Sequence, residues 1–270
     1  MTFINKLKKA WEVNNSLVCV GLDPDLTKLP ECLKDEEYPI FEFNKQIIDA
    51  THDLVCSYKP QVAYYAGQDA EDELQMTIDY IRETYPQIPI IFDSKRGDIG
   101  STASMYAKEA FERYNADSVT VNPYMGTDTL KPFLDYADRG VIALCRTSNP
   151  SGDEIQNLDA SGITIYKRVA EYAVEKWNYN KNILLVVGAT YPEELGQIRE
   201  ICPDIPFLVP GIGAQGGDVE AVLKVGQTAD GAGLIINSSR GIIYAGSGAD
   251  FARESRKATI ELRDLINQYR

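Results

Sequence analysis

The densest group of ionisable side chains in the sequence is the stretch Asp93-x-Lys95-x-x-Asp98-Ile99-x-x-Thr102. Asp93 and Lys95 are two residues apart, so in an extended chain their side chains point to the same side. The apolar run before them predicts a buried strand that ends at this pair, which argues against an ordinary surface ion pair. Asp98 precedes a predicted helix, where its carboxylate has two open roles: to join the charged pair or to cap free backbone N–H groups.

Lys59 ends another predicted buried strand, immediately before Pro60. Two lysines and two or three aspartates that converge on one pocket form a nearly neutral network, in which opposite neighbours replace water and so allow burial. Such a network speaks against a divalent metal, which needs an excess of carboxylate and carbonyl oxygens over ammonium groups. The sequence therefore predicts charged-group chemistry without a metal.

Two loops near the C-terminal end of the sequence predict a phosphate site. Residues 210–218 are rich in glycine and contain Gln215, and residues 237–241 contain Ser239 and Arg240. Glycine alone is weak evidence because it also serves ordinary loop geometry. The planar guanidinium of Arg240 suits a phosphate, so the combination of both loops with an arginine carries the prediction.

Short apolar runs alternate with helical patterns along the whole sequence, which predicts strands that are each followed by a helix. This pattern favours an α/β fold, a single (β/α)8 TIM barrel over residues 1–270 with an extra N-terminal helix at about residues 3–13. A doubly wound sheet is the alternative, but no GxGxxG follows the first run. The eight predicted strands cover residues 17–22, 54–59, 89–93, 118–121, 141–145, 183–187, 207–209 and 233–236, and the last helix covers about 249–269.

The barrel prediction brings the ionisable groups together, since chemistry in such barrels takes place where strands end and loops begin. Asp23 follows the first predicted strand, and Ser148 follows the fifth, at the start of a long irregular stretch over residues 147–162. The predicted phosphate loops follow strands seven and eight, where barrels often bind phosphate. Lys59, Asp93 and the two loops should therefore face one pocket.

Composition excludes several other classes of function. The formal net charge of −13 is poorly suited to non-specific nucleic-acid binding, which depends on Lys and Arg. Five cysteines without a CxxC indicate reduced thiols and a cytoplasmic protein, and no run resembles a signal peptide or a membrane span. The single histidine, His52, is expected on a helix surface and leaves no multi-histidine zinc site.

These residues resemble the orotidine 5′-phosphate decarboxylase family. The resemblance runs from Asp23 to Arg240, and its most specific parts are DxKxxDIxxT and GIGAQGGD. The length and the Asn237–Arg240 stretch are similar to the longer-chain branch, whereas the shorter branch usually has Val-Gly before its arginine. The resemblance implies conversion of orotidine 5′-phosphate to UMP and CO2 by a homodimer that uses no metal and no cofactor.

The resemblance also implies a role for each matching residue. Lys59, Asp93 and Lys95, with Asp98 from the partner subunit, would form a charged tetrad in which Lys95 stabilises and then protonates C6 of the pyrimidine. Asp93 would lie beside the substrate carboxylate, and Lys59 would position Asp93. The implied substrate-binding residues are Asp23 and Thr102 at the ribose, Ser148 at the pyrimidine, Gln215 and Arg240 at the phosphate, and Ile99, Pro210 and Ser239.

Three other functions are compatible with parts of this pattern. A metal-dependent decarboxylase of keto-sugar phosphates can share DxKxxD, but it should carry an acid where Lys59 stands. A Schiff-base aldolase usually has a lysine at the end of strand six, and here residues 183–188 contain none. A barrel that only binds a nucleotide monophosphate would not need the complete set of charged residues.

Overall fold

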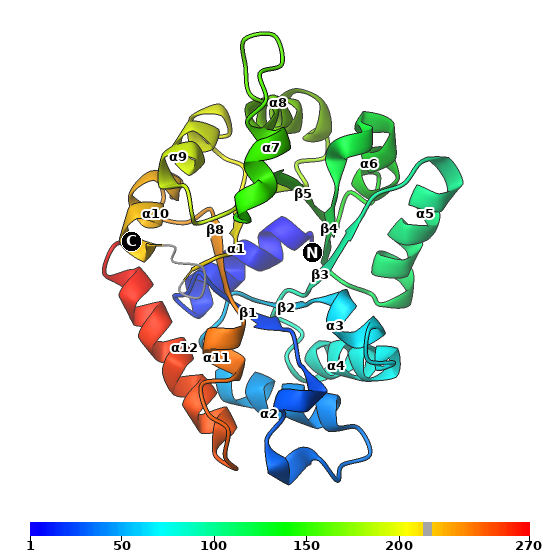
Figure 1. Ribbon diagram of the computed structural model, residues 1–270, viewed down its shortest axis with the longest axis vertical. Coiled ribbons are helices and arrows are strands. Elements are labelled where there is room, and N and C mark those ends of the chain that lie inside the picture. Colours follow the sequence, from blue (N-terminus) through cyan, green and yellow to red (C-terminus); the bar gives the residue numbers. More distant parts are fainter. Residues whose placement is uncertain (213–217) are drawn as a thin grey trace.

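The protein, a computed structural model that describes residues 1–212 and 218–270, places eight parallel strands in a ring surrounded by helices (Figure 1). The strand order is β2-β1-β8-β7-β6-β5-β4-β3. The strands are β1 Val18–Leu22, β2 Ser57–Pro60, β3 Ile91–Arg96, β4 Ser118–Val121, β5 Gly140–Arg146, β6 Ile183–Val187, β7 Phe207–Val209 and β8 Leu234–Ser238.

The two ends of this order meet, so the sheet closes into a barrel. Isolated parallel bridges join Tyr58 to Ile90 and Gln61 to Asp93, and thereby link β2 to β3. Every other neighbouring pair is also parallel, including β1 with β8. The predicted TIM barrel is confirmed, and each of the eight predicted strands overlaps an observed one.

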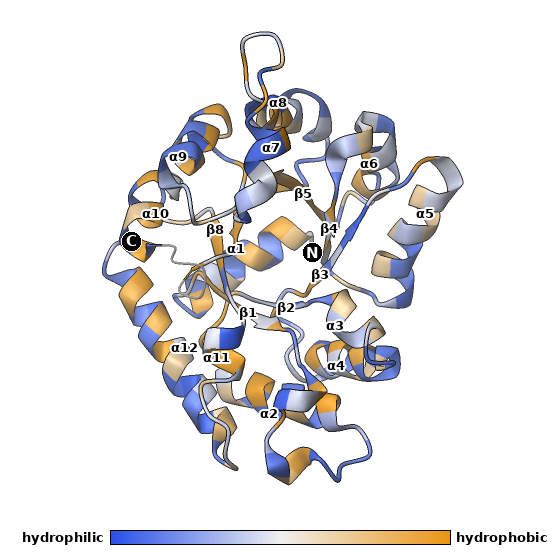
Figure 2. Ribbon diagram, in the orientation of Figure 1, coloured by the Kyte–Doolittle hydropathy of each residue, from blue (hydrophilic) through white to orange (hydrophobic). Residues whose placement is uncertain are grey.

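Helices follow the strands and cover the outside of the ring. Figure 2 shows hydrophobic strands such as β5 and β8 inside, and helices of mixed hydropathy such as α12 outside. This distribution is what an amphipathic helix packed on a buried sheet requires. The helices are α1 Phe3–Val13, α2 Pro39–Thr51, α3 Val62–Ala66, α4 Glu71–Thr84, α5 Gly100–Lys108, α6 Thr127–Leu134, α7 Asp153–Gln156, α8 Ile165–Tyr172, α9 Pro192–Ile201, α10 Val219–Gly226, α11 Arg240–Ile243 and α12 Phe251–Asn267.

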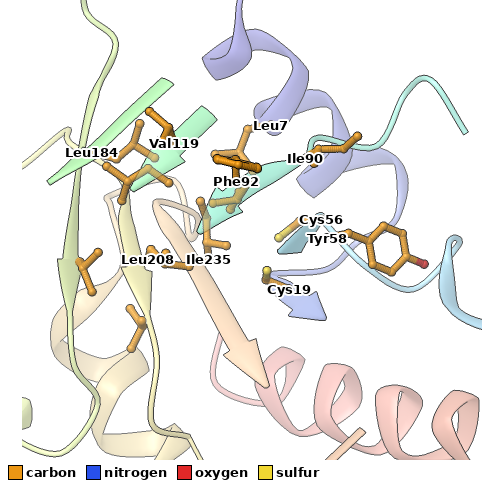
Figure 3. Close-up of a cluster of buried hydrophobic side chains, with 14 of the residues drawn as sticks. Leu7, Cys19, Cys56, Tyr58, Ile90, Phe92, Val119, Leu184, Leu208 and Ile235 are labelled. Carbon is orange, nitrogen blue, oxygen red and sulfur yellow. The ribbon is translucent and has the colours of Figure 1, made fainter. Parts of the chain in front are cut away.

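The predicted extra N-terminal helix is α1, which lies across the end of the barrel where the strands begin. Its Phe3 backbone N–H donates to the carbonyl of Asp138 at 2.8 Å, and its Lys6 ammonium lies 3.0 Å from Asp117. Figure 3 shows Leu7 of α1 beside Phe92 of β3 in the buried cluster. Helix α1 therefore closes the N-terminal end of the barrel, and the opposite end holds the loops that follow the strands.

One stretch is more regular than predicted. Residues 147–162, expected as an irregular loop, contain the short 3-10 helix η5 at Pro150–Gly152 and the single turn α7. Pro150 stands at the first helical position, and two acidic residues occupy the first turn of α7, both of which favour a helix start.

Within the described parts of the chain, no helix is long and apolar enough to cross a membrane.

Candidate active site

The ends of β1, β2 and β3 bring three predicted site residues together. Lys59 of β2 pairs in register with Gly21 of β1, two residues before Asp23. The bridge between Gln61 and Asp93 places the end of β3 beside the end of β2. Parallel neighbours therefore deliver their last side chains to one edge of the barrel.

These side chains form a chain of ion pairs at that edge. The Lys59 ammonium lies 2.8 Å from Asp93 Oδ2, and the Lys95 ammonium lies 2.7 Å from Asp93 Oδ1. Lys59 is also 3.8 Å from Asp23 Oδ1. Lys59 and Asp93 each expose only 4% of their surface, whereas 43% of the Lys95 side chain is exposed. Of Lys59, Asp93 and Lys95, Lys95 is thus the most accessible to a bound molecule.

The network fixes the charges of its buried members. Burial alone would raise the pKa of Asp93, but the positive charges of Lys59 and Lys95 outweigh it and hold this pKa well below its usual 3.8. Burial alone would lower the pKa of Lys59, and the nearby Asp23 and Asp93 instead raise it above 10.5. Both groups are therefore ionised at neutral pH.

The backbone reaches this geometry in a different way from the one that the spacing predicted. Lys95 has φ of +47°, a left-handed conformation that a lysine rarely adopts. The pairing of β3 with β4 also shifts register between Phe92 and Arg96. Asp93 and Lys95 do face each other, but a local turn of the strand achieves this rather than regular extended alternation.

Thr120 of β4 is a site residue that sequence reasoning missed. Its Oγ1 donates to Asp93 Oδ1 at 2.7 Å and accepts from the Lys95 backbone N–H at 2.9 Å. The hydroxyl thereby supports both the carboxylate and the left-handed residue that carries the ammonium. Thr120 lies within an apolar strand, so only the alternation of that strand hinted at an inward side chain.

Within the described residues, Asp98, Ile99 and Thr102 form no ion pair or hydrogen bond with Lys59 or Lys95. Asp98 Oδ1 accepts from the backbone N–H of Ile99 at 2.7 Å, and Asp98 forms no ion pair there. It does not cap α5, since Ile99 stands at that helix's N-cap position and no side chain bonds to the first turn. Ile99 and Thr102 are exposed. The chain thus brings together three of the four predicted tetrad residues.

A cavity of about 320 Å³ adjoins the network and contains several of the predicted substrate-binding residues. Asp23 Oδ1 and Ser239 Oγ are buried in this cavity, and neither forms a hydrogen bond with the described residues. Arg240, at the start of α11, is exposed and forms no ion pair with the described residues. The cavity is lined by Asp23, Tyr64, Pro210, Gly211, Ile212, Asn237, Ser238, Ser239, Arg240 and Gly241.

Close packing of β1 against β8 fixes the position of Ser239 in this cavity. A Cβ atom on Gly21 would lie 2.7 Å from the Cβ of Ser239, so only glycine allows this approach. Tyr64, which lines the cavity, is a further residue that the sequence did not single out. Gln215, predicted to meet the phosphate, lies outside the described residues.

Ser148 follows β5 and packs against the end of β6. A Cβ atom on Gly188 would come within 2.8 Å of the Ser148 Cβ and 2.9 Å of its backbone nitrogen. The loop is therefore seated on β6 at a position that accepts only glycine.

Among the described residues, no group of three or more His, Cys, Asp or Glu side chains could hold a metal ion.

Comparison with known proteins identifies the family of this chain. Residues 16–255 match the model of a family described as the orotidine 5′-phosphate decarboxylase / HUMPS family. The chain belongs to this family.

Two relatives in this family match the chain over its full length or nearly so. The chain is 58% identical over 270 residues to orotidine 5′-phosphate decarboxylase of Dechloromonas aromatica (strain RCB), with complete coverage of both chains. It is 58% identical over 269 residues to the protein of that name in Cellvibrio japonicus (strain Ueda107), covering 99% of this chain and 98% of the relative. The resemblance inferred from sequence is confirmed, as is the expectation that the chain is an enzyme.

A solved structure in the same family supports the fold. The structure of Leishmania donovani OMP decarboxylase superposes with a TM-score of 0.87 at 38% identity, covering 100% of this chain and 99% of that one. The barrel of this chain thus matches a solved decarboxylase of this family over its whole length.

Proposed function

We propose that this protein decarboxylates orotidine 5′-phosphate to UMP and CO2, the last step of UMP synthesis, without a metal or an organic cofactor. The observation that carries the proposal is the Lys59–Asp93–Lys95 network beside the cavity that holds Arg240. A phosphate at Arg240 and a reacting carbon at Lys95 would place the substrate across the mouth of the barrel. The full-length relatives named as this decarboxylase support the same reaction.

The proposed chemistry follows from the charges. The bond between C6 and the carboxylate breaks, CO2 leaves, and the electron pair stays on C6. The ammonium of Lys95, held 2.7 Å from Asp93, stabilises this pair as preorganised positive charge and then donates a proton to C6. Asp93 lies beside the substrate carboxylate, and its charge, kept by Lys59, disfavours that carboxylate before it departs.

Substrate binding in this proposal uses the surrounding loops. Asp23, whose Oδ1 forms no hydrogen bond with the described residues, accepts from a ribose hydroxyl, while Ser148 bonds to the pyrimidine amide. Arg240 and Gln215 hold the phosphate, and Pro210 and Ser239 line the same cavity. Binding energy from the phosphate, remote from the reacting carbon, then offsets the cost of placing two carboxylates together.

We also propose that the protein works as a homodimer in which Asp98 and Thr102 complete the site of the partner subunit. The support is the surface around these residues: Ile99 is 59% exposed, and Tyr124, Met105 and Met125 add further exposed apolar side chains on the neighbouring elements. Exposed apolar side chains that cluster in this way are typical of interaction surfaces.

The shared site has a direct test. Asp98→Ala and Lys59→Ala should each be inactive, and a mixture of the two should recover activity through heterodimers that contain one intact site. A mixture of Lys59→Ala with Asp93→Ala is the control, because both changes lie in the same half of the site and no intact site can form. Absence of recovery, despite exchange of labelled subunits, would contradict the shared site.

A metal-dependent decarboxylase of keto-sugar phosphates is the alternative within the family. It would need a carboxylate near Asp93 to complete a metal site, and Lys59 occupies the neighbouring position, bonded to Asp93 at 2.8 Å. We therefore favour the metal-free reaction. We further propose that residues 1–270 act as one domain in the cytoplasm, where the free cysteines stay reduced.

The deciding experiment is the change in ultraviolet absorbance when purified protein is mixed with orotidine 5′-phosphate in the presence of EDTA. Rapid conversion to UMP is the expected result. Turnover that EDTA abolishes and Mg²⁺ restores would favour the metal-dependent alternative, and tight UMP binding without turnover would favour a sensor.

A further inference from the structure

Arg146, the last residue of β5, is a buried arginine with an unusual number of contacts. It exposes 1% of its surface, and its guanidinium forms ion pairs with Asp153 of α7 and Glu194 of α9. A third donor group reaches Gln156 Oε1 at 3.1 Å. The ring of Tyr191 lies 4.4 Å from the guanidinium carbon. One side chain thus joins the strand to two separate segments of the barrel mouth.

The contacts of Gln156 extend this arrangement to the residue before Ser148. Gln156 Oε1 accepts from the backbone N–H of Thr147 at 2.9 Å, and its Nε2 donates to Thr147 Oγ1 at 2.7 Å. Arg146 itself donates to the Thr147 carbonyl at 3.3 Å. Thr147 is therefore held through its backbone and its side chain, and Ser148 follows directly on a backbone seated against Gly188.

We propose that Arg146 is a positioning residue for base recognition: its guanidinium fixes residues 147–156 so that Ser148 meets the pyrimidine ring. This inference rests on the proposed function, in which Ser148 bonds to the base. Arg146 touches neither the Lys59–Asp93–Lys95 network nor the cavity around Arg240 in the described structure. A change at Arg146 should accordingly affect the binding of the base and not the binding of the ribose phosphate.

The planar fork of arginine explains why this position needs more than a positive charge. Three nitrogen atoms of the guanidinium bond in three directions, to Glu194, Asp153 and Gln156. A lysine has one nitrogen on a flexible stem and cannot hold all three partners at once. Asp153 and Glu194 keep contact with solvent, at 51% and 21% exposure of their side chains, so they can be solvated again when the guanidinium is removed. Arg146→Lys should therefore fold.

The test compares two ligands that share the ribose phosphate and differ in the base. The dissociation constants of UMP and of ribose 5-phosphate are measured by titration calorimetry for the wild type and for five variants. Arg146→Lys and Gln156→Ala should each weaken UMP binding at least tenfold and change ribose 5-phosphate binding by less than twofold. Ser148→Ala should show the same selectivity, and Arg146→Lys added to it should cost little more. Arg168→Lys, which alters a partly exposed ion pair on α8, is the matched control and should leave both constants unchanged.

Two results would overturn the inference. Equal weakening of both ligands would mean that Arg146 only supports the fold, and unchanged UMP binding in Arg146→Lys and Gln156→Ala would mean that the loop keeps its position without the guanidinium. A failure of the proposed function is distinguishable, because the wild type would then not turn over orotidine 5′-phosphate, whether or not it binds UMP.

Discussion

Replacement of Thr120 by valine tests whether the hydroxyl that supports Asp93 and Lys95 contributes to turnover. Valine keeps the branched shape of the side chain but removes the 2.7 Å bond to the Asp93 carboxylate and the 2.9 Å acceptor for the Lys95 N–H. A hydrogen bond to a charged group contributes about 1.5 to 3 kcal/mol. If this support is needed in the transition state, kcat/KM should fall about 10- to 150-fold, since about 1.4 kcal/mol corresponds to a factor of ten.

The assay is the initial rate of conversion of orotidine 5′-phosphate to UMP, followed by ultraviolet absorbance, with kcat and KM determined separately. The loss should appear mainly in kcat, because Thr120 supports the reacting ammonium and does not line the cavity around Arg240. Thr120→Ser, which keeps the hydroxyl, is the matched control and should retain most of the activity. The reasoning is refuted if valine leaves kcat within twofold of the wild type, or if serine is as slow as valine.

Three further predictions concern the charged residues. Lys95→Ala should fold and bind UMP while turnover falls by many orders of magnitude, because it removes the only proposed proton donor; a variant that kept a tenth of the activity would exclude that role. Because the pKa of Asp93 is held below 3.8 in the folded state, Asp93 stabilises the fold above about pH 4 and loses this contribution as the pH falls. In urea unfolding, Asp93→Asn should therefore lose less stability than the wild type between pH 5 and pH 3. Parallel curves of unfolding free energy against pH for the two proteins would contradict this. Asp117→Ala, which removes the partner of buried Lys6, should lower the free energy of unfolding by about 3 to 5 kcal/mol, whereas Asp138→Ala, an exposed control, should cost less than about 0.5 kcal/mol.

Much of the barrel could be predicted because its strands are buried on both faces and therefore form short continuous apolar runs. The same feature located the site, since Lys59 and Asp93 stand where two of these runs end. The boundaries of the predicted strands differ from the observed ones mainly at β2, which begins three residues later than predicted, and at β3, where Ser94, Lys95 and Arg96 continue the strand. Apolar pattern alone cannot show that a strand extends through a lysine or an arginine.

The contacts between strands and loops could not be predicted in this way. Thr120 touches Asp93 because of the local register between β3 and β4, which a shift near Arg96 alters. Arg146 meets Glu194, 48 positions away, only after α7 and α9 have folded over the barrel mouth. The left-handed backbone of Lys95 could not be predicted either, because lysine normally avoids this conformation. Each of these features depends on tertiary packing.

The pairing of β1 with β8 means that the barrel cannot close until almost the whole chain has been made. Val18 leaves the ribosome long before its partner Ile236. The anchors of α1, Asp117 and Asp138, also emerge long after Lys6. A nascent chain of this protein therefore presents an apolar strand with an unpaired edge and an amphipathic helix without its docking site, features that favour aggregation before completion. Chaperone binding to the first strands, or co-translational delay near residue 236, would thus affect the yield of folded enzyme without any change in its final stability.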